Sequence, residues 1–173
     1  MNRRYSILII DDERGTREAM GKFLRPDYDV TLAEDGEIGI NLINRNHYDL
    51  ILSDICMEPG PSGLDVLETA LKRTPSPPCI LFTAYGSIET AVDAVKKGAF
   101  DFVTKPVNFD RLEIIIRRAL ESVRLKEENT ELKRRLGSSF GIKGMIGNST
   151  KMKNIIETIE QVAPTRTTVM ITG

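Results

Sequence analysis

Cysteine, histidine and long apolar runs are all scarce in this sequence of 173 residues. Its two cysteines, Cys56 and Cys79, are too few for a disulfide framework. On neighbouring parallel strands they would lie about 20 Å apart at ~3.3 Å per residue, whereas a disulfide needs Cα atoms within roughly 7 Å. The single histidine, His47, is interpreted as a surface loop residue rather than a catalytic one. No apolar run approaches the roughly 18 residues that a membrane span needs.

Net charge is also small, at −1, so neither nucleic acid nor a membrane is the default partner. Apolar residues make up 40% and charged residues 28% of the chain, which is typical of a soluble globular protein. The first residues enter a strand-like segment directly, and no signal-peptide pattern follows. We therefore expect a cytoplasmic protein without membrane contact, with one ordinary domain and an extension.

Strand-like and helix-like segments alternate over the first 108 residues. The strand-like segments are Ser6–Ile10, Asp29–Ala33, Leu50–Asp54, Cys79–Thr83 and Phe100–Thr104. The helices expected between them cover residues 14–25, 36–45, 63–74 and 86–97. Several strands are rich in Ile, Leu and Val without polar alternation, as is typical of strands covered by helices on both faces. Right-handed crossovers then predict a doubly wound parallel α/β sheet, whose strand order this pattern leaves open.

Polar side chains stand at the carboxyl ends of four of these strands. Asp11 and Asp12 follow the first, Asp54 ends the third, Thr83 ends the fourth and Lys105 follows the fifth. Because these ends meet at one edge of a parallel sheet, the side chains should converge there. A lone acidic run is more often a solvated face, but converging carboxylates repel one another unless a cation joins them, and Mg²⁺ prefers such oxygen ligands. Asp54 is then predicted to take up a phosphoryl group, with the other groups neutralising its charge.

The residues at these strand ends also resemble a known signature. The matching positions are Asp11-Asp12, Asp54, Thr83-Ala84 and Lys105-Pro106, and with their spacing they resemble response regulator receiver domains. The resemblance implies a flavodoxin-like five-stranded sheet of order 2-1-3-4-5. It also implies that a partner sensor histidine kinase phosphorylates Asp54.

The same resemblance assigns further roles at the site. It implies that Mg²⁺ is held by Asp11 or Asp12, by Asp54 and by the backbone carbonyl of Cys56. Thr83 and Phe102 match the pair that reorients on phosphorylation, in which the hydroxyl moves to the phosphate and the ring turns inward. A plain core aromatic is the alternative for Phe102.

Two features depart from the receiver pattern. The turn Met57–Gly63 is one residue longer than usual and carries Glu58 before its first proline. Cys56 and Tyr85 occupy the two positions that tune the lifetime of the phosphoryl group in the family, so no lifetime is predicted.

A long helix is expected from Asp110 to Leu136, which holds no glycine or proline. Its first half carries a broad apolar face suited to docking on the sheet. In its second half the apolar face narrows to one line of positions, which are 4, 3 and 4 residues apart: Leu125, Asn129, Leu132 and Leu136. This spacing is typical of a coiled-coil seam, and a buried Asn129 suits a parallel homodimer. The alternative is an amphipathic helix that ends in a solvated charged segment.

The last part of the sequence is predicted to be a linker over residues 137–147, a helix over 151–162 and a strand over 168–172. This order resembles the opening of a sigma-54 activator ATPase domain of the nitrogen regulatory protein C type, with Gly173 as the first glycine of its phosphate loop. The remaining glycines and the lysine of that loop are not in the chain, so we expect neither binding nor hydrolysis of ATP.

These inferences divide the chain into a receiver domain (1–120), a coiled-coil dimerisation linker (121–137) and a fragment of an ATPase domain (138–173). The predicted function is a phosphorylation switch, not an enzyme: phosphorylation changes how two receivers pair, either holding or releasing the coiled coil, and so controls a sigma-54-dependent transcription activator. Sigma-54 RNA polymerase and DNA would be reached only through parent domains. Two alternatives are an Mg²⁺-dependent aspartyl-phosphate phosphatase or phosphotransferase, and a dimerisation module that works without phosphorylation.

Overall fold

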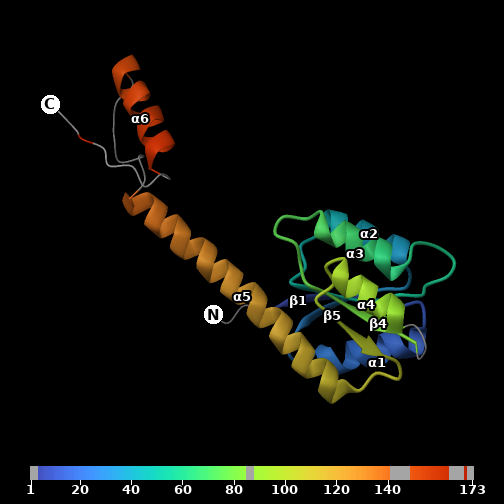
Figure 1. Cartoon of the computed structure of the whole chain (residues 1–173). Coiled ribbons are helices and arrows are strands. Elements are labelled where there is room, and N and C mark those ends of the chain that lie inside the picture. Colours follow the sequence, from blue (N-terminus) through green and yellow to red (C-terminus); the bar gives the residue numbers. More distant parts are fainter. Residues whose placement is uncertain (1–3, 85–87, 141–148, 164–169, 171–173) are drawn as a thin grey trace. The chain divides into compact units, whose positions relative to one another are not determined.

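The computed structural model describes the backbone of residues 4–84, 88–140, 149–163 and 170, and the side chains of these residues except 88–91, 135–140 and 160 (Figure 1). The strands are β1 (Ser6–Ile10), β2 (Asp29–Ala33), β3 (Leu50–Asp54), β4 (Cys79–Thr83) and β5 (Asp101–Thr104). The helices are α1 (Arg14–Leu24), α2 (Gly36–Arg45), α3 (Gly63–Leu71), α4 (Ile88–Lys96), α5 (Phe109–Phe140) and α6 (Thr150–Val162). Two compact units are separated after Lys126, and each is described by itself.

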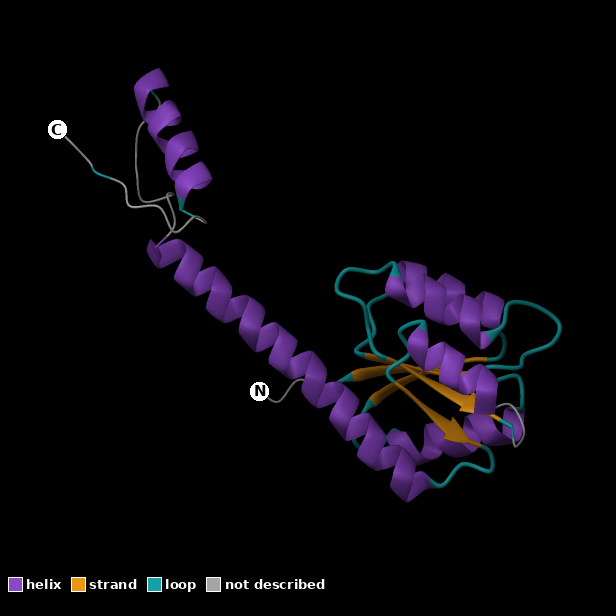
Figure 2. Ribbon diagram, in the orientation of Figure 1, coloured by secondary structure: helices purple, strands orange, loops and turns teal. Residues whose placement is uncertain are grey.

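The strands form a five-stranded parallel sheet in the order β2-β1-β3-β4-β5. Figure 2 shows these strands in orange, with purple helices on both sides of them. The predicted flavodoxin-like fold and its strand order are therefore confirmed. Four predicted strands agree with the structure at both ends, and the fifth begins at Asp101 instead of Phe100. Every residue of β3 and β4 is buried, which explains why these strands lack polar alternation.

Apolar side chains form a core on each face of the sheet. One cluster joins Leu8, Ile51 and Leu81 of the strands to buried residues of α2, α3 and α4. The other joins Ile9, Leu52 and further strand residues to α1 and the first half of α5. Successive strand residues point to opposite faces, so both clusters draw on the same strands.

Local signals place the helix ends. The side chain of Asp35 accepts the N–H of Ile38 at 2.7 Å and caps α2. Ser62 and Asp65 form a reciprocal capping box at the start of α3. Gly98, with φ +111°, follows the end of α4 as predicted. The helix predicted to reach residue 74 ends at Leu71, because Pro75 disfavours helical backbone at the residue before it.

Helix α5 runs farther than the sequence suggested. It extends to Phe140, so the predicted start of a linker at Gly137 is wrong. One glycine and two serines cost about 1 kcal/mol or less each in a helix, too little to stop one that is already propagating. Helix α6 begins after Ser149, whose hydroxyl accepts the N–H of Met152 at 3.3 Å. Apart from Met170, the predicted strand 168–172 lies outside the described residues.

Among the helices of the described ranges, none is both long enough and apolar enough to span a bilayer.

Gly63, at the end of the long turn, packs against the end of β3, and its replacement tests this contact. A Cβ atom at this position would lie 2.1 Å from the backbone oxygen of Asp54. We expect Gly63→Ala to lower the free energy of unfolding by about 1–3 kcal/mol, measured by urea denaturation. Gly15→Ala is the matched control in α1, where a Cβ meets nothing within 4 Å and should be neutral or stabilise by up to about 1 kcal/mol. Equal stability of Gly63→Ala and the native chain would contradict the contact.

Candidate functional site

The structure brings the predicted polar residues together at the carboxyl edge of the sheet. Asp11 follows β1, Asp54 ends β3, Thr83 ends β4 and Lys105 follows β5. The ammonium group of Lys105 forms a short contact with Asp54 Oδ2 and lies 2.9 Å from Asp11 Oδ2. One lysine therefore balances carboxylates that come from two neighbouring strands.

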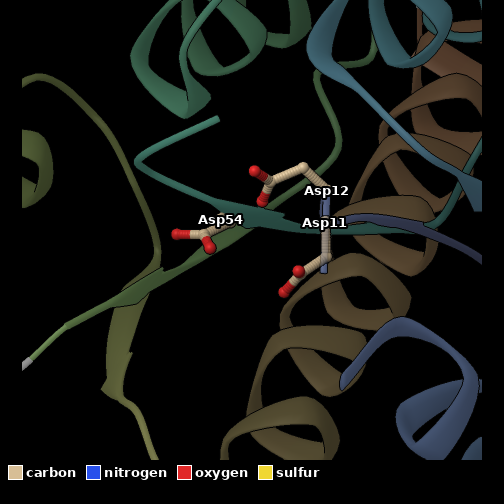
Figure 3. Close-up of side chains that lie close together, drawn as sticks. All are labelled: Asp11, Asp12 and Asp54. Atoms are coloured by element: carbon tan, nitrogen blue, oxygen red, sulfur yellow. The ribbon is translucent and has the colours of Figure 1, made fainter. Parts of the chain in front are cut away.

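Asp11, Asp12 and Asp54 form an acidic cluster (Figure 3). One carboxylate oxygen from each residue lies within 4.8 Å of those of the other two. Asp11 is fully buried and Asp54 is 6% exposed, whereas Asp12 is exposed. Two carboxylates of the cluster are therefore buried, and the third, that of Asp12, faces solvent.

Burial dominates the electrostatics of Asp11. Loss of hydration raises the pKa of Asp11 above its ordinary value, although Lys105 and the N–H of Glu13, 2.9 Å from Oδ1, act in the opposite direction. For Lys105, burial alone would lower the pKa, but its contacts with Asp54 and Asp11 outweigh burial and raise it. Lys105 therefore stays charged at neutral pH.

The donor atoms of the cluster fit a hard divalent cation. Within the described part of the chain, the buried Oδ2 of Asp11 has the Lys105 ammonium, 2.9 Å away, as its one polar partner. Carboxylate oxygens are the ligands that Mg²⁺ prefers, with water completing its shell. The backbone N–H of Cys56 donates to Asp54 Oδ1 at 3.2 Å, so this residue also lies against the cluster. Its carbonyl remains a predicted ligand.

Thr83 and Phe102 lie on one side of the same region. Thr83 is fully buried, and its hydroxyl donates to the backbone oxygen of Ala84 at 3.3 Å. Phe102 pairs with Leu81 in the sheet and is half-buried against the α2–α3 core cluster. The proposed switch role of Thr83 and Phe102 remains a prediction.

Arg17 is a contact of the site that the sequence reasoning missed. Its Nη1 donates to the backbone oxygens of Asp11 and Asp12, at 2.6 and 3.4 Å. The side chain is only 12% exposed. Little in the sequence marks Arg17 as a site residue, because it lies one helical turn after Glu13 and belongs to neither of the two family signatures.

A hollow of about 490 Å³ opens beside Lys105. Its other lining residues come from the start of α1 and from the connection into α5: Glu13, Gly15, Thr16, Ala19, Met20, Pro106, Val107 and Phe109. The lining is mostly apolar, and the hollow gives a partner a surface next to the acidic cluster.

A doubly wound sheet with an acidic cluster and a lysine at its carboxyl edge is the arrangement found in receiver-type signalling domains. Residues 7–117 match the model of the response regulator receiver domain, and the chain belongs to that family.

Curated relatives that match the chain are named as regulatory proteins. It is 34% identical to the nitrogen assimilation regulatory protein NtrX of Azorhizobium caulinodans over 98% of this chain and 37% of that protein. It is also 34% identical to the regulatory protein AtoC of Escherichia coli, over 96% of this chain and 36% of AtoC. The chain thus spans about a third of the length of these relatives.

Solved structures agree with this assignment. NtrX from Brucella abortus superposes with a TM-score of 0.72 at 34% identity, covering 94% of this chain and 35% of that one. FixJ-N superposes with a TM-score of 0.62 at 28% identity, covering 69% of this chain and 95% of that one.

The raised pKa of Asp11 predicts a stability effect with a definite sign. A carboxyl group that binds its proton more tightly when folded loses stability as pH rises from its ordinary pKa through its folded pKa. Asp11→Asn should therefore raise the free energy of unfolding at about pH 7 by roughly 0.5–2 kcal/mol, and the gain should shrink towards about pH 4. Urea denaturation in a metal chelator measures both values.

Asp27→Asn, in an exposed turn, is the control and should change the free energy of unfolding by less than about 0.5 kcal/mol. If Asp11→Asn is less stable than the native chain at neutral pH, the ion pair with Lys105 outweighs the cost of burial.

Proposed function

We propose that this chain is the receiver unit of a phosphorelay, in which Asp54 accepts a phosphoryl group from a sensor histidine kinase with Mg²⁺. The observation that carries the proposal is the ammonium of Lys105 lying between the buried carboxylates of Asp11 and Asp54. This arrangement leaves an acceptor oxygen, a counter-charge and a cation pocket within one site.

The chemistry is a displacement at phosphorus. A carboxylate oxygen of Asp54 bonds to phosphorus as the P–N bond to the donor imidazole breaks, and the imidazole leaves with that electron pair. Little other covalent work is needed, because phosphoryl transfer depends on positioning and charge neutralisation. Bound Mg²⁺, held by Asp11 or Asp12, Asp54 and the Cys56 carbonyl, would supply part of that neutralisation.

The chain's own groups then hold the product. Lys105 offers its positive charge to the phosphoryl oxygens. The hydroxyl of Thr83, which now donates to Ala84, is the donor proposed to turn towards the phosphoryl group. The half-buried ring of Phe102 is proposed to turn inward at the same time. The hollow beside Lys105 is a suitable place for the donor to approach.

A phosphatase or phosphotransferase with the same nucleophile is the weaker candidate. Such enzymes usually carry a second acid two residues after the nucleophile to protonate the leaving group, and this chain has Cys56 there. A module that works without phosphorylation is also disfavoured, because the acidic pair, Asp54, Thr83 and Lys105 are all present, and Lys105 contacts the carboxylates of Asp11 and Asp54.

We further propose that phosphorylation changes how two copies pair, through the receiver surface formed by α4, β5 and α5 and through the coiled-coil seam. On α5, Leu125 and Leu132 are 53% and 57% exposed, as expected for a seam that needs a second helix. Leu136 belongs to the same proposed seam, but its side chain lies outside the described residues.

The proposed output is control of a sigma-54-dependent transcription activator in the cytoplasm. The match to NtrX covers 98% of the chain and so continues past the receiver through α6. This supports residues 1–120 as receiver, 121–137 as dimerisation linker and 138–173 as part of the activator's ATPase domain. Contact with sigma-54 RNA polymerase and DNA is proposed for other domains of such an activator.

Phosphorylation of Asp54 can be tested directly. Incubation with phosphoramidate and Mg²⁺ should add one phosphoryl group, detected by intact-mass spectrometry, and a metal chelator should prevent it. Asp54→Asn should abolish the adduct, while the exposed Asp27→Asn variant should keep it. An equal adduct on Asp54→Asn would assign the phosphoryl group to another residue, and rapid repeated turnover of the donor would favour the enzyme.

The seam predicts a dimer that seam substitutions weaken. Leu132→Glu places a charge at a seam position, and Asn129→Lys removes the proposed Asn pair. Each should raise the dimer dissociation constant about tenfold or more, measured by sedimentation equilibrium. Thr130→Glu, on the same helix but off the seam, is the control and should leave it nearly unchanged. Dimers of unchanged strength in both seam variants would show that the receiver surfaces hold the pair.

A further inference from the structure

Arg17 connects two loops at the edge of the sheet. It lies in the first turn of α1, and its Nη1 donates to the backbone oxygen of Asp11 at 2.6 Å and, more weakly, of Asp12 at 3.4 Å. Its Nη2 lies 3.9 Å from Oε2 of Glu34, which follows β2. The guanidinium therefore joins the loop after β1, which carries both acidic residues, to the loop after β2.

The two acidic side chains depend differently on this contact. The carboxylate of Asp11 is also held by the N–H of Glu13 and by Lys105. The exposed carboxylate of Asp12 makes no hydrogen bond or ion pair to any residue in the described ranges. Its direction is therefore set by its own backbone, to which the Arg17 guanidinium is bonded. A charge-assisted bond to a carbonyl is stronger than a neutral one, so it can hold that backbone in place.

Arg17 also brings a positive charge close to the acidic pair without contacting the carboxylate oxygens that would bind a cation. Lys105 contacts the carboxylate oxygens of Asp11 and Asp54, which an incoming cation must share. Arg17 contacts only the backbone oxygens of the acidic pair, so the carboxylates stay free while their mutual repulsion is reduced. Because its side chain is 88% buried from solvent, with 12% exposed, this charge is only weakly screened.

We propose that Arg17 is a positioning residue that holds Asp11 and Asp12 ready for a divalent cation. The inference rests on the proposed function, because it assigns the acidic pair to cation binding. Residues that hold a metal ligand in place typically change metal affinity about 10–100-fold when they are replaced.

The test compares Mg²⁺ binding by the native chain, Arg17→Met and Arg17→Lys. Arg17→Met keeps much of the apolar stem and loses the donors, whereas Arg17→Lys keeps the charge but loses the fork that reaches two carbonyls. Isothermal titration calorimetry should show Mg²⁺ bound about tenfold more weakly by Arg17→Met, with Arg17→Lys between the two. The Mg²⁺ concentration that half-saturates phosphoramidate modification should rise by the same factor, while the rate at saturating Mg²⁺ stays within about twofold.

Arg14→Met is the matched control. It removes the same charge from the same helix, but Arg14 is exposed and pairs with Glu18 instead of the acidic loop. Its Mg²⁺ affinity should equal that of the native chain. An equal loss in Arg14→Met would overturn the proposal, because net charge would then explain the effect.

Unchanged Mg²⁺ affinity in both Arg17 variants would also overturn it. If Arg17→Met does not fold, Arg17→Lys decides, with a threefold or larger loss of affinity supporting the proposal and no loss overturning it. A native chain that binds Mg²⁺ but is not modified by phosphoramidate would instead overturn the proposed function, while the calorimetry would still decide the role of Arg17.

Discussion

The ion pairs of Lys105 with Asp11 and Asp54 are the contact on which the site depends. Burial of a carboxylate without a partner is costly, and here two buried carboxylates lie against a third, exposed one. A single ammonium group between them makes the arrangement tolerable, yet Asp11 still keeps a raised pKa. The burial of Asp11 therefore lowers the stability of the fold at the position where a bound cation would restore it, as is common at functional sites.

The order of the strands makes that contact possible. Ile10 pairs with Ser53 in the sheet, so the residues that follow, Asp11 and Asp54, lie side by side. The backbone N–H of Lys105 donates to the oxygen of Thr83 at 2.7 Å, which fixes the start of the lysine side chain two strands away from β3. The long side chain of Lys105 bridges that distance, so this residue after β5 pairs with Asp11 after β1 and with Asp54 on β3.

The loops around the site are held by backbone contacts. Gly63 packs directly on the backbone of Asp54 and closes the long turn that follows β3. Its N–H donates to the oxygen of Ile55 at 3.0 Å. The long turn is therefore anchored at its end against the same strand that carries Asp54. Arg17 holds the loop on the other side of the cluster through carbonyl groups.

Periodicity and strand-end chemistry were sufficient to predict most of the fold and the acidic cluster. The β3 strand and its terminal Asp54 could be read directly, because an apolar run of buried strand is a local signal. The receiver signature added the strand order, which local pattern leaves open. The end of α5 was misjudged, since Gly137 is a weak helix breaker when the helix is already formed. The burial of Asp11 and the two-sided contact of Lys105 arise only when β1, β3 and β5 come together. They depend on distances between segments far apart in the chain, and no spacing within one segment encodes those distances.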